Sequence, residues 1–216
     1  MAIDLPAYHA ILAVCKSYQA TLVAVSKTKS VEDIRALYNA GQRDFGENYV
    51  QELLEKQPLL PADIRWHFIG HLQSNKVKQI APFVHLIHAV DSVKLLQEIS
   101  KQSAKYNRSI HCLLQVHIAQ EETKFGFDEE GLQDLWQQKQ QSPEKFAAAV
   151  LAGFMGMASF TDDTQQVRKE FQQLKTIADQ WLPGGILSMG MSADYQWALE
   201  EGSNMIRVGS LLFGTR

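Results

Sequence analysis

Lys27 is the residue whose type and position most clearly suggest chemistry, because it closes a short apolar run. Residues 22–25 are all apolar, the pattern of a strand buried on both faces of a parallel sheet. In α/β folds the reactive groups gather at the carboxyl ends of such strands, and an amine partly withdrawn from water has a lowered pKa and can attack carbonyl carbons. The simpler alternative is a surface lysine whose stem covers apolar surface while its amine stays in water.

Two segments near the other end of the chain combine glycine with hydroxyl side chains. Residues 188–192 read S-M-G-M-S, and residues 207–210 read R-V-G-S. Gly190 and Gly209 permit a backbone to approach an anion closely, and Ser192 can offer its hydroxyl at the start of the following helix. A plain helix cap at Ser192 and a plain turn at Gly209 are the alternatives.

Apolar runs that could form strands alternate with stretches of helical periodicity along the whole chain. We expect strands at 22–26, 43–48, 65–69, 83–88, 110–118, 148–154, 186–189 and 205–208. We expect helices at 6–20, 30–41, 49–56, 75–81, 91–106, 128–141, 162–181 and 193–201. This alternation predicts an α/β fold with a parallel sheet and right-handed crossovers.

Eight such repeats are the number that closes a (β/α)8 TIM barrel. We therefore expect residues 1–216 to form one barrel domain. The helix after the last strand is nearly absent, and an extra N-terminal helix would cover the gap that it leaves. An open doubly wound sheet is the alternative architecture.

A barrel brings all the strand ends to one face, so residues far apart in the sequence become neighbours there. The loops after strands seven and eight are those from which barrels commonly build a phosphate site with backbone N–H groups. Arg207 adds a permanent cation at the end of an apolar strand, where it must face a carboxylate or a ligand. Lys27, the phosphate loops and Arg207 on one barrel mouth together suggest pyridoxal phosphate, with the aldehyde on Lys27 and the pyridine nitrogen at Arg207.

Composition restricts the remaining function classes. The chain has 216 residues, 45% of them hydrophobic, and a formal net charge of −3, with no clustered basic stripe of the kind that binds nucleic acid. It has no apolar run of membrane-spanning length and no signal-peptide pattern at its N-terminus. Cys15 and Cys112 are predicted to be buried free thiols, which is typical of a reducing compartment. We therefore expect a cytoplasmic protein without nucleic-acid or membrane partners.

Five ordered motifs give this chain a resemblance to a known family. They are A-V-S-K-T-K, F-G-E-N-Y-V-Q-E, W-H-F-I-G-x-L-Q-x-N-K, L-S-M-G-M-S-x-D and R-V-G-S-x-L-F-G, and they run from Ala24 to Gly214. They resemble the pyridoxal-phosphate homeostasis protein family, also called the YggS or PROSC family. The sequence departs from many members at Ser30, where they have proline, and at His71, where the motif varies.

The resemblance implies a single barrel of the fold-type III class, similar to the N-terminal domain of alanine racemase, that binds pyridoxal phosphate as a Schiff base without established catalysis. Lys27 would be the Schiff-base residue and Arg207 would contact the ring nitrogen. The resemblance places three residues at the phosphate, Ser192, Gly209 and Ser210, and two more along the pocket, Asn48 and His67.

Three functions share these residues. A carrier would hold the cofactor reversibly for intracellular vitamin B6 homeostasis and yield it to apoenzymes. A small amino-acid racemase is the alternative, but it needs acid–base groups on both faces of the bound substrate, and in similar racemases one of them comes from an additional domain of the partner subunit. A phosphosugar enzyme explains the phosphate loops but not Arg207.

Other residues receive simpler interpretations. Lys124, in a segment resembling a family lysine segment, could accept the cofactor in a transfer or could be a solvated loop residue. The histidines show no metal-binding spacing, and no metal is expected. Since no swapped domain is expected, we predict a monomer.

Overall fold

The computed structural model describes residues 3–121 and 125–214. Its strands are β1 (Thr21–Val25), β2 (Asp44–Glu47), β3 (Arg65–Phe68), β4 (Leu86–Val90), β5 (Ile110–Gln115), β6 (Ala149–Met155), β7 (Ile186–Ser188) and β8 (Met205–Val208). Its α-helices are α1 (Leu5–Ser17), α2 (Val31–Asn39), α3 (Val50–Lys56), α4 (Val77–Ile80), α5 (Val93–Lys105), α6 (Glu129–Gln141), α7 (Thr164–Trp181), α8 (Tyr195–Glu200) and α9 (Ser210–Phe213). Short 3₁₀ helices lie at η1 (Gln57–Leu59), η2 (Ser74–Lys76) and η3 (Pro143–Phe146).

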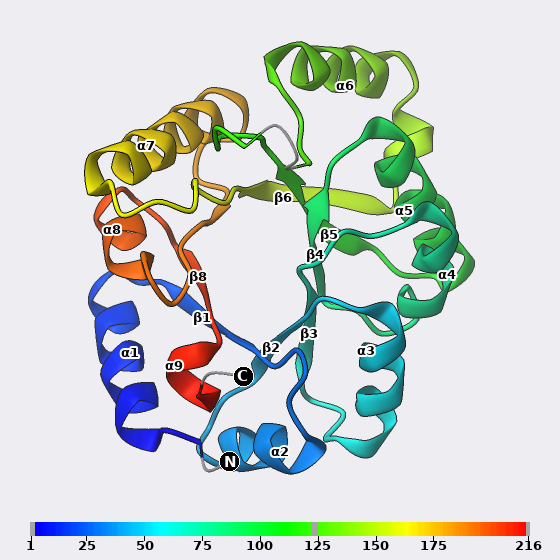
Figure 1. Cartoon of the computed structure of the whole chain (residues 1–216). Helices are drawn as coiled ribbons and strands as arrows, with labels where there is room; N and C mark the ends of the chain where they lie inside the picture. The colour runs from blue at the N-terminus through cyan, green and yellow to red at the C-terminus, as the bar shows by residue number, and fades with distance from the viewer. Residues whose placement is uncertain (1–2, 122–124, 215–216) are drawn as a thin grey trace.

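Within the described ranges, the eight strands close into a parallel barrel in chain order, with helices around the outside (Figure 1). Every neighbouring pair is parallel, and β8 returns to pair with β1, where Val23 lies opposite Arg207. The TIM-barrel prediction is confirmed. Because each strand runs the same way, the loops that follow the strands meet at one end of the barrel.

The N-terminal helix lies where the sequence predicted it, against the end of the chain. The Asp4 side chain caps α1 by accepting from the Ala7 N–H at 2.9 Å, as expected of an N-cap aspartate. α1 packs on β1 and α9, and the Asp4 N–H donates to the Leu212 carbonyl at 2.9 Å. The extra helix thus closes the side of the barrel that the four-residue α9 leaves open.

The core has two parts. The larger part lies between the barrel and its helices, and the smaller part fills the barrel interior, where it contains Val23, Leu86, Ala89, Leu113, Met155 and Met205. Polar side chains are also buried inside the barrel, among them Asp44, His67, His88, Ser188 and Arg207. Buried polar groups require hydrogen-bond partners, and the partners of these five residues determine how the barrel mouth is built.

The structure differs from the predicted elements in three places. β4 begins at Leu86 rather than at residue 83, because the N–H groups of Phe83 and Val84 donate to the Ile80 carbonyl and close a turn. β5 ends at Gln115, and Val116 makes only an isolated bridge to Phe127. The short helix α9 was not predicted.

Two expectations about the environment of the chain can be compared with the structure. In the described part of the chain, no helix is both long enough and apolar enough to cross a bilayer. Cys15 and Cys112 are buried and free, as predicted. Burial raises the pKa of the Cys15 thiol to about 11 and raises that of Cys112 as well.

Candidate functional site

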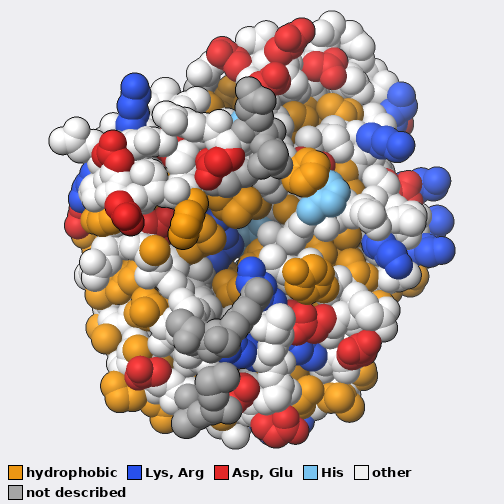
Figure 2. All heavy atoms as spheres, in the orientation of Figure 1, with side chains coloured by type: hydrophobic (Ala, Val, Ile, Leu, Met, Phe, Trp, Pro, Cys, Tyr) orange, Lys and Arg blue, Asp and Glu red, His pale blue; other side chains and the backbone are white. Residues whose placement is uncertain are grey.

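A cavity of about 350 Å³ opens at the carboxyl ends of the strands. The face drawn in Figure 2 is hollowed near its centre, and Lys or Arg side chains, in blue, lie beside the hollow. The cavity volume falls in the range of roughly 300–1,000 Å³ that small-molecule sites occupy. Six of the residues predicted from the sequence line it, namely Lys27, Asn48, Ser192, Arg207, Gly209 and Ser210. The other lining residues are Val25, Thr28, Lys29, Ile69, Met157, Met191, Ala193 and Gly214.

The backbone just before Lys27 is fixed by a buried charge cluster. The Ser26 carbonyl accepts from Lys56 Nζ at 2.7 Å, and Ser26 Oγ donates to Glu47 Oε1 at 2.7 Å. Lys56 Nζ also donates to Glu47 Oε1 at 2.8 Å and to Glu52 Oε1 at 2.6 Å. One ammonium group from α3 therefore connects the end of β1 to the end of β2.

The residue after Lys27 is held by the same cluster. Thr28 has a φ of 63°, which is an unfavourable backbone conformation for a β-branched residue. Its N–H donates to Glu52 Oε1 at 2.5 Å, so a charged acceptor stabilises the turn. Because the backbone is anchored on both sides of Lys27, the half-buried lysine extends toward the cavity from a fixed position.

Glu47 and Lys56 were not identified from the sequence as functional residues. The Glu47 side chain is fully buried and that of Lys56 is 8% exposed. Burial raises the pKa of the Glu47 carboxyl, and the Lys56 ammonium opposes that rise. The available signal was Glu52 four residues before Lys56, a spacing at which helix side chains meet, although Glu47 lies on a different element.

Arg207 forms the floor of the cavity and is held from behind. It is 4% exposed. Its Nη1 donates to the Ser188 carbonyl at 2.8 Å and to Ser188 Oγ at 2.7 Å, and its Nη2 donates to the Gly156 carbonyl at 3.1 Å. Burial lowers the pKa of the guanidinium to about 10, so Arg207 stays charged at neutral pH. Arginine carries five N–H groups. Within the described part of the chain, three of those of Arg207 donate to Ser188 and Gly156, which leaves the Nε–H and one Nη2–H for a ligand.

The two glycine-containing loops lie side by side, as predicted. The Gly209 N–H donates to Ser192 Oγ at 3.2 Å, and the Arg207 N–H donates to the Gly190 carbonyl at 3.0 Å. Gly190 has a φ of 95°, and a Cβ there would lie 2.6 Å from the Cβ of Ala198, so only glycine fits. Because Ser192 Oγ accepts from Gly209, its own hydrogen remains available to donate. Ser210 begins α9, and the first N–H groups of a helix have no partner within the helix.

Asn48 supplies a buried acceptor at the opposite side of the cavity. Asn48 Oδ1 is buried and has no hydrogen-bond partner among the described residues. The backbone of Asn48 is packed against Gly70, where an added Cβ would lie 2.2 Å from the Asn48 carbonyl oxygen. An orphan acceptor of this kind is costly unless a bound molecule or water completes its hydrogen bond.

Comparisons with known proteins identify the family of this chain. The alanine racemase N-terminal domain family matches residues 3–216. The pyridoxal phosphate homeostasis protein of Aquifex aeolicus is 40% identical over 205 residues, which cover 91% of this chain and 87% of that protein. The protein of the same name from Schizosaccharomyces pombe is 39% identical over 202 residues, which cover 90% and 84%. The chain belongs to the pyridoxal phosphate homeostasis protein family.

Solved structures place the barrel in the same family. PipY of Synechococcus elongatus is 36% identical and matches 94% of this chain and 98% of its own, with a TM-score of 0.84 without PLP and 0.82 with PLP bound. Alanine racemase of Bartonella henselae, with covalently bound pyridoxal phosphate, has a TM-score of 0.73 at 19% identity. This chain spans 60% of that racemase, and the likeness shows a shared fold.

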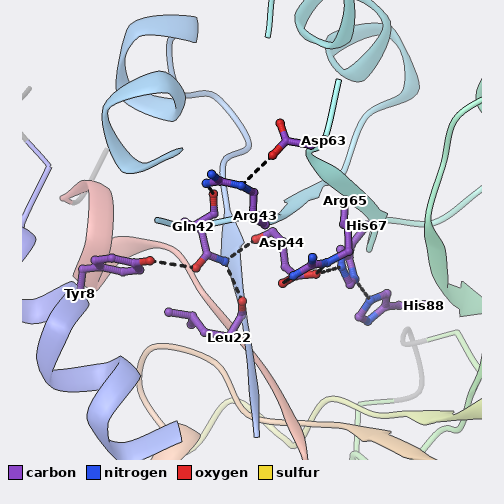
Figure 3. Close-up of polar contacts among 9 residues, drawn as sticks. All are labelled: Tyr8, Leu22, Gln42, Arg43, Asp44, Asp63, Arg65, His67 and His88. Atoms are coloured by element: carbon purple, nitrogen blue, oxygen red, sulfur yellow. Dashed lines mark hydrogen bonds and ion pairs between the residues drawn. The ribbon is translucent and has the colours of Figure 1, made fainter. Parts of the chain in front are cut away.

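His67 does not lie where the sequence placed it. It is 1% exposed and is absent from the residues that line the cavity. Its side chain lies deeper in the barrel, between Asp44 and His88 (Figure 3). Residues two apart along a strand point to the same face. Ile69, which follows the end of β3 and lies two residues after His67, is the residue that reaches the cavity here. The prediction that His67 lines the cavity was therefore wrong.

One further lysine lies beside the cavity, and another falls outside the described residues. Lys124 falls outside the described residues. Lys76 lines a neighbouring hollow that shares only Asn48 with the main cavity. The described residues contain no group of three or more His, Cys, Asp and Glu side chains arranged to hold a metal ion.

Proposed function

We propose that this protein binds pyridoxal 5′-phosphate in the cavity and acts as a carrier in vitamin B6 homeostasis. The observation that carries the proposal is a buried arginine with unused donors in the same cavity as a lysine at a strand end. The family membership supports the same ligand, since PipY has been solved with PLP bound.

The residues present fit the chemical groups of PLP. Lys27 supplies the amine for a Schiff base with the cofactor aldehyde, and one water molecule is released when that bond forms. The free donors of Arg207 suit the pyridine nitrogen as an acceptor. Ser192 supplies a hydroxyl donor for the phosphate, and Ser210 supplies a hydroxyl and a backbone N–H. Gly209, whose N–H donates to Ser192 Oγ, lets the backbone lie close to the phosphate. The buried Oδ1 of Asn48 can accept from a hydroxyl donor on the ring.

The cavity favours a carrier over a racemase. Among the described lining residues, the ionisable side chains are Lys27, Lys29 and Arg207. Racemisation requires an acid–base group on each face of the bound amino acid. Lys29 Nζ donates to the carbonyls of Phe213 and Gly214 at 3.1 Å, which holds it away from that role.

The proposal extends to partners and compartment. The carrier would act in the cytoplasm as a monomer and would yield PLP to apoenzymes, because a Schiff base is reversible and its hydrolysis returns the free aldehyde. The net charge of −3 gives no electrostatic attraction to nucleic acid.

Trapping of the cofactor tests the proposal. The purified protein is incubated with PLP, its visible absorption is recorded, and the adduct is reduced with borohydride and located by peptide mapping. We expect a yellow protein with the reduced adduct on Lys27. Lys27→Ala should lose the adduct, whereas Lys29→Ala, which changes the other lysine of the same cavity, should keep it.

A second assay distinguishes a carrier from a racemase. Amino acids are incubated with the loaded protein in D₂O, and exchange of their α-protons is followed by NMR. A carrier gives no exchange above that of free PLP, whereas exchange that depends on Lys27 would establish the racemase alternative. A colourless protein that takes up no PLP would refute the proposed function.

A further inference from the structure

A continuous chain of buried hydrogen bonds runs through the barrel interior and ends at Arg207. Asp44 Oδ1 lies 3.0 Å from His67 Nε2, and His67 Nδ1 lies 2.9 Å from His88 Nε2. His88 Nδ1 lies 3.0 Å from Ser188 Oγ, which accepts from Arg207 Nη1 at 2.7 Å. Figure 3 shows the first part of this chain, from Arg65 through Asp44 and His67 to His88.

The Asp44 end fixes which atoms donate and which accept along this chain of hydrogen bonds. Arg65 holds Asp44 with two hydrogen bonds, from Nε to Oδ1 and from Nη2 to Oδ2. Burial alone would raise the pKa of Asp44, but the hydrogen bonds from Arg65 and His67 outweigh burial and lower it to about 2. Asp44 is therefore an ionised acceptor, and His67 Nε2 must carry the hydrogen between them.

The rest of the chain follows from that end. A neutral His67 with its hydrogen on Nε2 has a bare Nδ1, which can only accept from His88 Nε2. Burial lowers the pKa of His88 well below its ordinary value, and the positive charge of Arg207 lowers it further, so His88 is neutral. Since its one hydrogen lies on Nε2, its Nδ1 is bare. Ser188 must then donate to His88, and its oxygen accepts from Arg207, which is always a donor.

The groups that face this chain are few and can be named. Arg65 lies beside Asp44, and the ring of His85 lies 5.5 Å from that of His67. His111 is near enough to His85 to influence its pKa, and the negative charge of Asp194 acts on Arg207. A second cavity, of about 290 Å³, opens at the amino ends of the strands and is lined by Asp44, Arg65, His67, His85 and His111. Water therefore reaches the Asp44 end of the chain without passing through the cofactor cavity.

We propose that His67, His88 and Ser188 are positioning residues for Arg207, and that they couple protonation at the amino end of the barrel to the contact between Arg207 and the bound cofactor. The second half of this inference rests on the proposed function, while the hydrogen-bond chain itself exists without the cofactor.

Uptake of one proton reverses the direction of the hydrogen bonds from His67 to Ser188. His67 then carries hydrogens on both ring nitrogens, and its Nδ1 donates to His88 Nε2. The neutral His88 must now hold its hydrogen on Nδ1, which donates to Ser188 Oγ. The Ser188 hydroxyl hydrogen loses its acceptor and rotates, so Arg207 contacts a serine with a different hydrogen-bond pattern. One proton is taken up from solvent and none is lost, while a positive charge is added inside the barrel.

The chain can be tested in the cofactor-free protein by ¹⁵N NMR of the histidine rings, which distinguishes the two neutral tautomers. At pH 8 we expect both His67 and His88 to carry the hydrogen on Nε2. At lower pH we expect His67 to become doubly protonated while the His88 hydrogen moves to Nδ1. A His88 that holds its hydrogen on Nδ1 at pH 8 would overturn the proposed direction of the chain.

The coupling is tested in the PLP-loaded protein by following the absorption band of the bound cofactor as the pH is lowered from about 8 to about 5. The wild-type protein should show an inflection that is lost in Ser188→Ala and in His67→Gln, since glutamine can bridge Asp44 and His88 but cannot titrate. Ser203→Ala, another buried serine, and His85→Gln are the matched controls and should keep the inflection.

The two measurements separate the possible failures. An inflection that persists unchanged in Ser188→Ala and His67→Gln, or is absent from the wild type, would overturn the coupling even if PLP is bound. If no cofactor band forms, the proposed function and the coupling both fail, while the tautomer measurement still decides the chain. Arg207 keeps its bonds to the Ser188 and Gly156 carbonyls in Ser188→Ala, so a purely structural role for Ser188 predicts no change in the pH response.

Discussion

The charge cluster beneath Lys27 gives a stability prediction that can be worked through from its contacts. Lys56 Nζ makes hydrogen bonds of 2.6–2.8 Å to the Ser26 carbonyl, Glu47 and Glu52. Replacing Lys56 with Met keeps most of the side-chain volume but leaves the fully buried Glu47 carboxylate without its cation. Breaking a buried pair by removal of one partner costs about 3–5 kcal/mol.

This loss is large compared with the total stability of a domain, which is about 5–15 kcal/mol. For a chain of this size, about 1 kcal/mol corresponds to roughly 2–4 °C in Tm, so Lys56→Met should lower Tm by about 6–20 °C. The measurement is urea denaturation at several pH values, together with thermal unfolding. Lys101→Met is the matched control, because Lys101 is 66% exposed and lies 3.9 Å from Glu98. It should change the unfolding free energy by less than about 0.5 kcal/mol.

The pH dependence gives this prediction a direction that can be checked. Burial already raises the pKa of Glu47, and Lys56 opposes the rise, so loss of Lys56 raises the folded-state pKa further. An acid whose pKa is raised on folding binds more protons in the folded state, and its stability falls as pH rises. The difference between wild type and Lys56→Met should therefore be largest near pH 8 and shrink toward pH 5. A difference below about 1 kcal/mol, or one that does not change with pH, would refute the reasoning.

Three further predictions concern single sites. Gly70→Ala should lower Tm and weaken PLP binding, because its Cβ would lie 2.2 Å from the Asn48 carbonyl oxygen; an unchanged Tm would contradict the close approach. Neither Cys15 nor Cys112 should react with a thiol reagent in the native protein, since both are buried and their pKa values are raised; both should react in urea, and rapid labelling without denaturant would contradict their burial. The stabilising contribution of Asp44 is present above pH 3.8 and is lost as pH falls toward its folded pKa of about 2. Asp44→Asn should therefore flatten the dependence of the unfolding free energy on pH in that window. If the slope is unchanged in the variant, Asp44 does not cause the loss of stability in acid.

The side chains at strand ends were predictable because strand position alone decides their place. Lys27 follows one apolar run, and Arg207 lies within another. A closed barrel is enough to bring these two residues together at one mouth. The pairing of the two phosphate loops followed in the same way from the order of β7 and β8 in the barrel. The prediction did not require knowledge of any side-chain contact.

The residues that the sequence misplaced or missed depend on contacts between elements. His67 and Ile69 belong to the same expected strand, and the level at which each enters the barrel depends on the stagger between neighbouring strands, which composition does not report. Glu47 lies on β2 and Lys56 on α3, so their ion pair joins two elements. The sequence alone does not distinguish a buried lysine from an exposed one, and most lysines are exposed. β4 was misplaced because Phe83 and Val84 are apolar residues of a turn, whose hydrogen bonds to Ile80 leave no pattern in the sequence.

Two polar clusters lie beneath the cavity: the charge cluster around Lys56, and the chain of hydrogen bonds that ends at Arg207. Each cluster positions a different half of the proposed site. Lys56 fixes the backbone beside Lys27 and therefore the amine that would bond to the aldehyde. Ser188 holds Arg207, whose N–H donates to the Gly190 carbonyl, so the proposed donor to the ring nitrogen is joined by hydrogen bonds to a loop proposed for the phosphate. Lys56→Met should thus slow formation of the borohydride-trapped adduct while leaving noncovalent PLP affinity nearly unchanged, and Ser188→Ala should alter the cofactor band while leaving the rate of trapping unchanged. If each variant changes both quantities equally, the cavity behaves as a single unit and this division is wrong.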